Sequence, residues 1–276
     1  MAQGVVFRVL GPLEVVCGAR AVRIPAGKQR TLLASLLLSP NEVVPMADLV
    51  GLLWDDALPD SPRAALHTCL TRLRTTLGRH EQGLSGLIHS SAAGYAIDAD
   101  AGSLDLLRFR AHIASSHAAA AACDDSAEAA ALVEALSLWR GPVLPDVRSV
   151  SLHRDVVPRI TEEWLRARER CHELDLARGR HDELVGELRV LIRRYPFHER
   201  FWHQLILSLY RCGRRVEALE AFRDVSGRLR DEMGMDPSEQ LRSLHMAILR
   251  GDPGLMGSGG LVAHRNGRLG KSAEIG

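Results

Sequence analysis

The chain has 276 residues, of which 46% are hydrophobic and 25% are charged, and its mean hydropathy is -0.05. These values are those of an ordinary globular protein that is long enough for one large domain or two of usual size. The 35 basic and 34 acidic residues give a net charge of +1, which excludes a global field for nucleic acid, a membrane or an acidic partner, so any such surface must be local.

The first hundred residues alternate between strand and helix signals. Runs of β-branched residues separated by turn residues predict antiparallel strands at 5–10, 13–16 and 21–24. Helical periodicity then predicts helices at 27–39, 46–54 and 62–78, the last of which starts after Ser61 with Pro62 in its first turn. Two further strands, at 86–90 and 94–98, are joined by a turn of small residues. The predicted order is therefore a sheet, three helices and a hairpin.

The strand signals vanish after about residue 104. Amphipathic helices are expected at 104–122, 125–139, 156–178, 181–195, 198–212, 214–233 and 237–250. Gly179-Arg180 and Gly213-Arg214 recur at a spacing of 34 residues, which is the period of tetratricopeptide repeats. The sequence thus predicts an α+β domain at 1–99 and an all-α, tetratricopeptide-like domain at 100–253. The glycine-rich stretch 254–276 is expected to be a disordered tail.

Signatures of catalysis, metal binding and membrane insertion are missing. Gly27-Lys28 lacks the first glycine and the Ser/Thr of a phosphate-binding loop, and the 12 histidines never form HExxH. The five cysteines are scattered and include no CxxC pair, and no segment approaches the roughly 18 apolar residues of a membrane span. We expect a cytoplasmic, nucleoid-associated protein that is not an enzyme and has no cofactor, metal or membrane partner.

The segment 61–80 is the informative one. It contains four arginines and no Asp or Glu, while a leucine stripe marks the side that is buried. Arginine can bind guanine with two hydrogen bonds, and threonine can meet a phosphate or a thymine methyl group, so such a helix fits the major groove of DNA. The hairpin that follows has the position of a wing. The competing interpretation is the solvated face of an amphipathic helix. The predicted outward residues are Arg63, His67, Thr68, Thr71, Arg72, Arg74 and Thr75.

Arg72 and Arg74 lie about 200° apart around a helix, so both cannot point at one base. We expect one of them to contact bases and the other mainly phosphate. A fragment that ends near Asp100 is expected to fold by itself and to keep some affinity for DNA.

Several motifs, taken in order, resemble those of the Streptomyces antibiotic regulatory protein family. In the first half they match its DNA-binding domain, and in the second half its bacterial transcriptional activator domain. The resemblance covers nearly all of residues 5–253. The matching stretches are 7–15, 28–30, 53–54, 72–74, 94–95, 138–142, 195–200, 213–219 and 234–237.

The resemblance implies a winged helix of the response-regulator output type followed by a tetratricopeptide-like domain. Members of the family activate antibiotic biosynthesis genes: they bind direct repeats in promoter DNA near the -35 element and recruit RNA polymerase holoenzyme. The sigma factor and the carboxyl-terminal domain of the alpha subunit are the implied contacts, and a homodimer on direct repeats is a further implied partner. The other open interpretation is a helical-repeat adaptor that binds protein and not DNA.

The helix at 62–78 is expected to read bases, with the start of the first helix and the hairpin holding the DNA backbone. Besides the outward residues of that helix, the candidate DNA-binding residues are Lys28, Arg30, Ser90, Ser91 and Tyr95.

Overall fold

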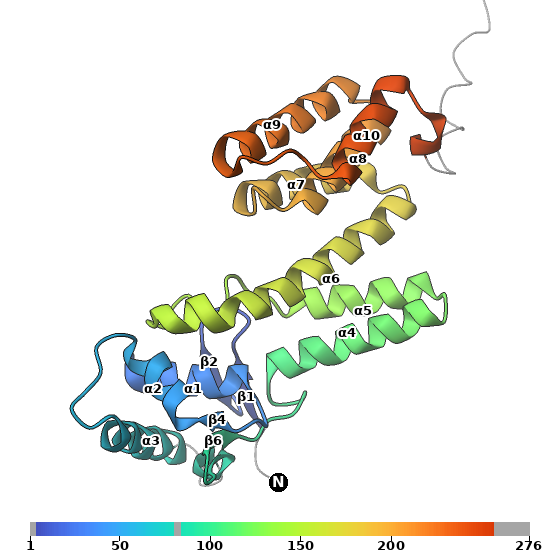
Figure 1. The fold of residues 1–276 in the computed structure, drawn as a ribbon. Coiled ribbons are helices and arrows are strands. Elements are labelled where there is room, and N and C mark those ends of the chain that lie inside the picture. Colours follow the sequence, from blue (N-terminus) through green and yellow to red (C-terminus); the bar gives the residue numbers. More distant parts are fainter. Residues whose placement is uncertain (1–3, 80–83, 257–276) are drawn as a thin grey trace, which may run out of the picture. The chain divides into compact units, whose positions relative to one another are not determined.

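The computed structural model describes residues 4–79 and 84–256 and is mostly helical, with a small β region near the N-terminus (Figure 1). The chain divides into two compact units, residues 1–168 and 169–276. Most of the tail predicted at 254–276 lies outside the described residues. Its first three residues belong to a short 3-10 turn, Pro253–Met256.

A three-stranded antiparallel sheet opens the first unit. It consists of β1 (Val5–Arg8), β2 (Glu14–Cys17) and β3 (Arg20–Ala21), in the order β1-β2-β3. Phe7 lies opposite Val15, and both side chains are buried on the same face. The predicted strand at 21–24 is shorter and earlier than expected, because only two residues of β3 pair with β2.

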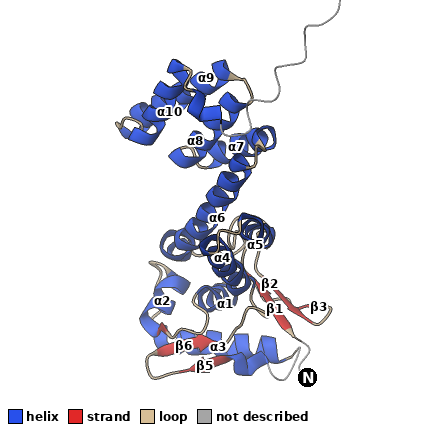
Figure 2. Ribbon diagram, turned by 90° about the vertical axis from the view of Figure 1, so that its right-hand side faces the viewer, coloured by secondary structure: helices blue, strands red, loops and turns tan. Residues whose placement is uncertain are grey.

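Three helices follow in the predicted order: α1 (Lys28–Leu38), α2 (Met46–Trp54) and α3 (Pro62–Gly78). All residues of α1 from Thr31 to Leu38 are buried, because α2, α3 and strand β6 (Gly94–Ile97) pack around this helix (Figure 2). A helix that is buried all round is mostly apolar, and the hydroxyls of its two buried polar residues, Thr31 and Ser35, donate to the helix backbone. This explains the run of leucines in α1 and makes it the centre of the unit.

The hairpin is formed by β5 (Ile88–Ser90) and β6, which pair antiparallel. A short strand, β4 (Val44–Pro45), pairs with the other edge of β6, and no sequence pattern predicted it. The predicted strand at 86–90 is partly wrong, since Leu84–Leu87 form a 3-10 turn. A Cβ atom at Gly94 would lie 2.0 Å from the carbonyl oxygen of Val44, so only glycine permits this close approach of β4 and β6.

The first unit continues past residue 99, where the sequence placed a domain boundary. It also contains α4 (Asp105–Ala121), α5 (Asp125–Ser137), a π-helical turn (Leu152–Val156) and the first part of α6 (Val157–Ala177). The side chain of Asp124 accepts a hydrogen bond from the backbone N–H of Ala127 at 2.9 Å and so caps α5.

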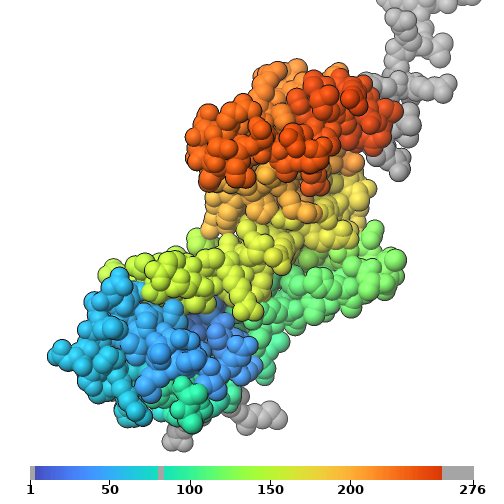
Figure 3. Space-filling view, in the orientation of Figure 1, coloured from blue at the N-terminus to red at the C-terminus, as the bar shows by residue number. Residues whose placement is uncertain are grey.

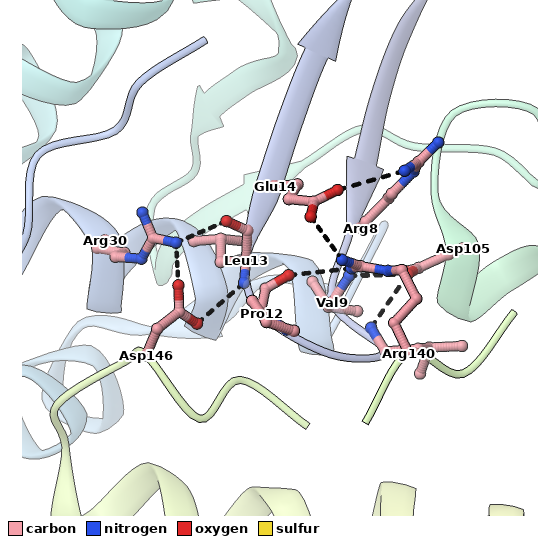
Figure 4. Close-up of polar contacts among 10 residues, drawn as sticks. Arg8, Val9, Pro12, Leu13, Glu14, Arg30, Asp105, Arg140 and Asp146 are labelled. Atoms are coloured by element: carbon pink, nitrogen blue, oxygen red, sulfur yellow. Dashed lines mark hydrogen bonds and ion pairs between the residues drawn. The ribbon is translucent and has the colours of Figure 1, made fainter. Parts of the chain in front are cut away.

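A polar cluster joins the β1–β2 turn to the start of α4 (Figure 4). The Asp105 carboxylate is 5% exposed and accepts hydrogen bonds from the backbone N–H groups of Val9 (2.8 and 3.0 Å) and Leu10 (3.0 Å). Phe7 donates its N–H to the carbonyl of Ser103 at 2.7 Å, and it forms a parallel bridge with Leu104. The turn thus depends on α4 for its backbone hydrogen bonds.

The loop after α5 binds the same turn. Arg140 forms an ion pair with Glu14 at 2.8 Å and donates to the carbonyl of Pro12 at 3.0 Å. The Asp146 carboxylate accepts from the N–H of Leu13 at 2.9 Å and pairs with Arg30 of α1. We call Asp105, Arg140, Asp146 and their partners the clasp. It joins the motif at 7–15 to the motif at 138–142 and to Asp146, which are more than 120 residues further along the chain.

Up to residue 256, where the described part of the second unit ends, its regular elements are helices. It contains the end of α6, α7 (His181–Arg194), α8 (Glu199–Arg211), α9 (Arg215–Met233) and α10 (Glu239–Arg250). Gly179 (φ +81°) and Gly213 (φ +76°) make the left-handed turns between α6 and α7 and between α8 and α9. The 34-residue spacing therefore corresponds to two successive helical hairpins.

Candidate nucleic-acid interface

The outer face of α3 carries Arg63 and Arg72, two of the four arginines in the segment 61–80. The helix starts after Ser61 with Pro62 as its first residue, and it ends at Gly78. Leu66, Leu70, Leu73 and Leu77 are at most 1% exposed, so this stripe anchors α3 on the core. In Figure 3 the cyan atoms of this part of the chain form an outer edge of the first unit. The exposed residues of the helix are Arg63, Ala64, His67, Thr68, Thr71, Arg72 and Thr75.

The threonines of this face are hydrogen-bonded to the helix itself. The hydroxyl of Thr68 donates to the carbonyl of Ala64 at 2.9 Å, that of Thr71 to His67 at 3.0 Å, and that of Thr75 to Thr71 at 2.8 Å. Such bonds to the carbonyl four residues earlier are a common alternative for threonine inside helices. In this geometry each hydroxyl donates to the helix backbone in the free protein.

Arg74 is directed to the hairpin and is not on the open face. Its Nε and Nη2 atoms donate to the carbonyl of Ile88 at 3.2 and 2.8 Å, and Nη2 donates to the hydroxyl of Ser90 at 3.2 Å. Arg72, in contrast, is exposed. The two arginines do point in different directions, as their spacing requires, but the partner of Arg74 is strand β5.

Lys28 lies at the start of α1, close to the open face of α3. Its ammonium group donates to the carbonyl of Leu53 and lies 5.7 Å from the centre of the Trp54 ring. A cavity of about 400 Å³ lies between the start of α1 and α3. Its basic lining residues are Lys28 and Arg72. Helix N-termini carry a partial positive charge and free N–H groups, which favour anions. The lining residues are Ala26, Lys28, Gln29, Trp54, Ala65, Thr68, Cys69 and Arg72.

Two predicted DNA-binding residues, one half-buried and one buried, have partners within the first unit. Arg30 pairs with Asp146 and donates to the carbonyls of Leu13 (2.6 Å) and Ile24 (3.3 Å), so its guanidinium is a member of the clasp. Tyr95 is 8% exposed and packs in the core of the unit beside β4. In the free protein neither side chain points freely to solvent, so their predicted contacts with DNA would need these interactions to change. Their partners come from distant parts of the chain, so no local sequence signal could have shown this.

The tip of the hairpin is polar but carries no cation. The hydroxyl of Ser91 accepts from the N–H groups of Ala93 (3.3 Å) and Gly94 (3.2 Å), which closes the turn. His89 on β5 lies 3.5 Å from the carboxylate of Asp98. Ser90 and Ser91 are both exposed, so the hairpin offers hydroxyl groups and backbone, not charge, to a ligand.

The part of the chain that the structure describes holds no cluster of three His, Cys, Asp or Glu residues with metal-binding geometry. Within the same residues, no helix combines the length and the apolar character that a membrane crossing needs. The basic face of α3, its cavity with α1 and the adjoining hairpin form the candidate interface of the first unit.

Comparisons with known proteins identify relatives among transcriptional regulators. Residues 104–249 match the family described as the Bacterial transcriptional activator domain. The chain is 34% identical to the transcriptional regulatory protein EmbR of Mycobacterium tuberculosis, over 90% of this chain and 64% of that protein. It is also 34% identical to the regulatory protein DnrI of Streptomyces peucetius, over 90% of this chain and 93% of that protein.

A solved structure is similar as well. The structure of M. tuberculosis EmbR in complex with a low affinity phosphopeptide superposes with a TM-score of 0.81 at 32% identity, covering 90% of this chain and 66% of that chain. The chain thus spans about two thirds of the length of EmbR. The alignment with EmbR, a transcriptional regulatory protein, spans 90% of this chain. The match to the bacterial transcriptional activator domain spans more than half of the residues. The chain belongs to the Streptomyces antibiotic regulatory protein family of transcriptional regulators, which carry the bacterial transcriptional activator domain.

Proposed function

We propose that this chain is a sequence-specific DNA-binding transcriptional activator whose first unit contains a winged helix. The observation that carries the proposal is the outer face of α3, which is basic, free of acidic residues and exposed beside a hairpin. The order of sheet, three helices and hairpin supports the same assignment. In this account α3 enters the major groove and the β5–β6 hairpin is the wing.

The exposed residues form two groups, one suited to base edges and one suited to the phosphate backbone. Arg72 and Arg63 have the length and the charge for guanine edges or phosphates. They lie on opposite sides of the threonines, and His67 lies on the side of Arg63. Lys28 and the first N–H groups of α1 suit a backbone phosphate in the cavity that Arg72 also lines. Ser90 and Ser91 at the hairpin tip suit the neighbouring backbone.

The second unit supplies protein contacts in this proposal. Repeated helical hairpins build concave surfaces that bind other proteins. A cavity of about 270 Å³ lies between α6, α8 and α10, and it is lined by Arg200, His203 and Arg211 among others. RNA polymerase holoenzyme and a second copy on direct repeats near the -35 element are the partners that the family implies. Control of antibiotic or other secondary-metabolite genes is the corresponding role.

A salt titration of duplex DNA binding tests the proposal. Phosphate contacts release counterions, so the logarithm of the affinity should fall linearly with the logarithm of the salt concentration, with a slope of about -0.9 per phosphate contacted. A preferred duplex should also bind more tightly than a scrambled one. If the chain is instead a protein adaptor, no affinity for duplex DNA will appear at any salt concentration.

A further inference from the structure

The exposed side of α3 carries a stripe of methyl-bearing residues directly opposite its leucine stripe. Leu66, Leu70, Leu73 and Leu77 follow one another at spacings of 4, 3 and 4 residues. The outer stripe repeats these spacings with an offset of two residues, which is about 200° around the helix. Its members are Ala64, Thr68, Thr71 and Thr75, all of them exposed.

The hydrogen bonds of these threonines limit what they can do. Each hydroxyl hydrogen of Thr68, Thr71 and Thr75 is donated to the helix backbone at 2.8 to 3.0 Å. A phosphate oxygen accepts hydrogen bonds and cannot donate them, so a threonine in this state has nothing to give it. What remains is a methyl group and an acceptor lone pair.

The threonine methyl group and the acceptor lone pair fit an A·T pair better than a G·C pair. In the major groove an A·T pair presents the C5-methyl group of thymine and the N6 amino group of adenine. A G·C pair presents an amino group without a methyl group. A methyl group with an adjacent acceptor is therefore complementary to A·T. From Ala64 to Thr75 the stripe is roughly 16 Å long, or about five base-pair steps.

The cations of the helix lie beside the stripe and not within it. Arg72 borders it on the side of α1 and the Lys28 cavity, while Arg63 lies on the other side. Arg74 is held by β5 and does not reach the stripe. Charge at the margins suits phosphates and the outer bases, whereas the centre of the face is left to apolar contact.

We infer that the stripe of Ala64, Thr68, Thr71 and Thr75 reads A·T pairs in the target DNA through thymine methyl groups. This inference rests on the proposed function, since it presumes that α3 lies in the major groove. It assigns sequence preference to the threonines and leaves most of the affinity to the arginines and Lys28.

The experiment starts with the full chain and a library of random DNA duplexes. Failure to enrich any sequence would defeat the proposed function, and the inference with it. In an enriched duplex, each thymine is then replaced by deoxyuridine, which removes only the C5-methyl group. At one or more positions the affinity should fall roughly four-fold, because a buried methyl-sized group contributes about that much. If no thymine is sensitive, DNA binding stands and the inference is overturned.

Variants of Thr71 test which group of this side chain contacts the thymine methyl group. Thr71→Ser removes the methyl group and keeps the hydroxyl, so it should bind the thymine duplex roughly four-fold more weakly and lose sensitivity to one deoxyuridine. Thr71→Val keeps the methyl group and should bind within about two-fold of the wild type. The matched control is Thr76→Ser, a threonine of the same helix that is bonded to Gln29 and half-buried. It should keep the full sensitivity. The reverse order, with Ser binding normally and Val weakly, would show that the hydroxyl is the reading group.

Discussion

Arg72 and Arg74 have different environments, and their replacement should separate DNA binding from stability. Arg72→Ala should weaken DNA affinity by about 1–3 kcal/mol and leave the free energy of unfolding within about 0.5 kcal/mol of the wild type, because the side chain is exposed. Equilibrium denaturation and a DNA titration of the same preparation measure both quantities. A loss of stability without a loss of affinity would contradict this role for Arg72.

Arg74→Ala should show the opposite pattern in the free protein. It removes the bonds to Ile88 and Ser90, so we expect a loss of about 1–2 kcal/mol of stability and faster hydrogen exchange in β5. DNA affinity should fall only as far as the hairpin is needed for binding. Unchanged exchange in β5 would mean that the guanidinium does not brace the hairpin.

Asp105 is the buried charge of the clasp. Burial raises the pKa of its carboxyl group, and the hydrogen bonds from Val9 and Leu10 oppose this shift. Asp105→Ala leaves both N–H groups without an acceptor and should cost about 1–3 kcal/mol for each of them, whereas Asp105→Asn keeps one acceptor oxygen and should cost less. Denaturant titrations at pH 7 measure both losses. Equal costs for the two variants would show that the carboxyl group does not hold the turn.

The same carboxyl group predicts a pH dependence. Its pKa in the folded state is raised above the unfolded value near 3.8, so the folded state binds the proton more tightly. Its contribution to stability is then fully present below the unfolded pKa and is lost as the pH rises through the folded pKa. The stability of the wild type relative to Asp105→Asn should therefore decrease as the pH rises from about 3.5. An increase over the same range would show that the hydrogen bonds outweigh burial.

At the scale of elements, the clasp decides which fragment folds. A fragment of residues 1–100 lacks Asp105, Arg140 and Asp146, so it loses the partners of the β1–β2 turn and of Arg30. In contrast to the expectation from the sequence, we expect the fragment 1–100 to lack a cooperative thermal transition. The fragment 1–168 should unfold in a single cooperative transition. A fragment 1–100 that melts cooperatively near the temperature of 1–168 would show that the clasp is dispensable.

The sequence predicted the helices and strands that are determined by residue patterns within the segment itself. The leucine stripe, Pro62 and Gly78 were enough to locate α3 from 62 to 78, as observed. Strand β4 was not predictable, since two residues that include a proline form no pattern. The clasp and the burial of Tyr95 depend on pairings between distant segments, which periodicity does not encode. For that reason the basic face of α3 could be read from the sequence, but the internal roles of Arg30 and Arg74 could not.

At the scale of the whole molecule, α6 is a single helix that crosses the boundary of the two units at Arg168. In the proposed division of labour, the first unit binds DNA and the second contacts the transcription machinery. The fragment 1–168 should therefore bind the selected duplex within about ten-fold of the full chain, or about 1.4 kcal/mol. It should not raise transcript levels with purified RNA polymerase holoenzyme. Full activation by this fragment would overturn the division.

In the proposed complex, DNA covers the outer face of α3. Hydroxyl-radical footprinting of the full chain, with and without the selected duplex, measures this directly at the side chains. DNA should reduce oxidation in the α3 peptide that contains His67, which is exposed. It should leave unchanged the α10 peptide that contains Met246, which is 45% exposed and oxidises readily. Protection of the Met246 peptide with no change at His67 would contradict the account, because DNA would then lie on the second unit and not on α3.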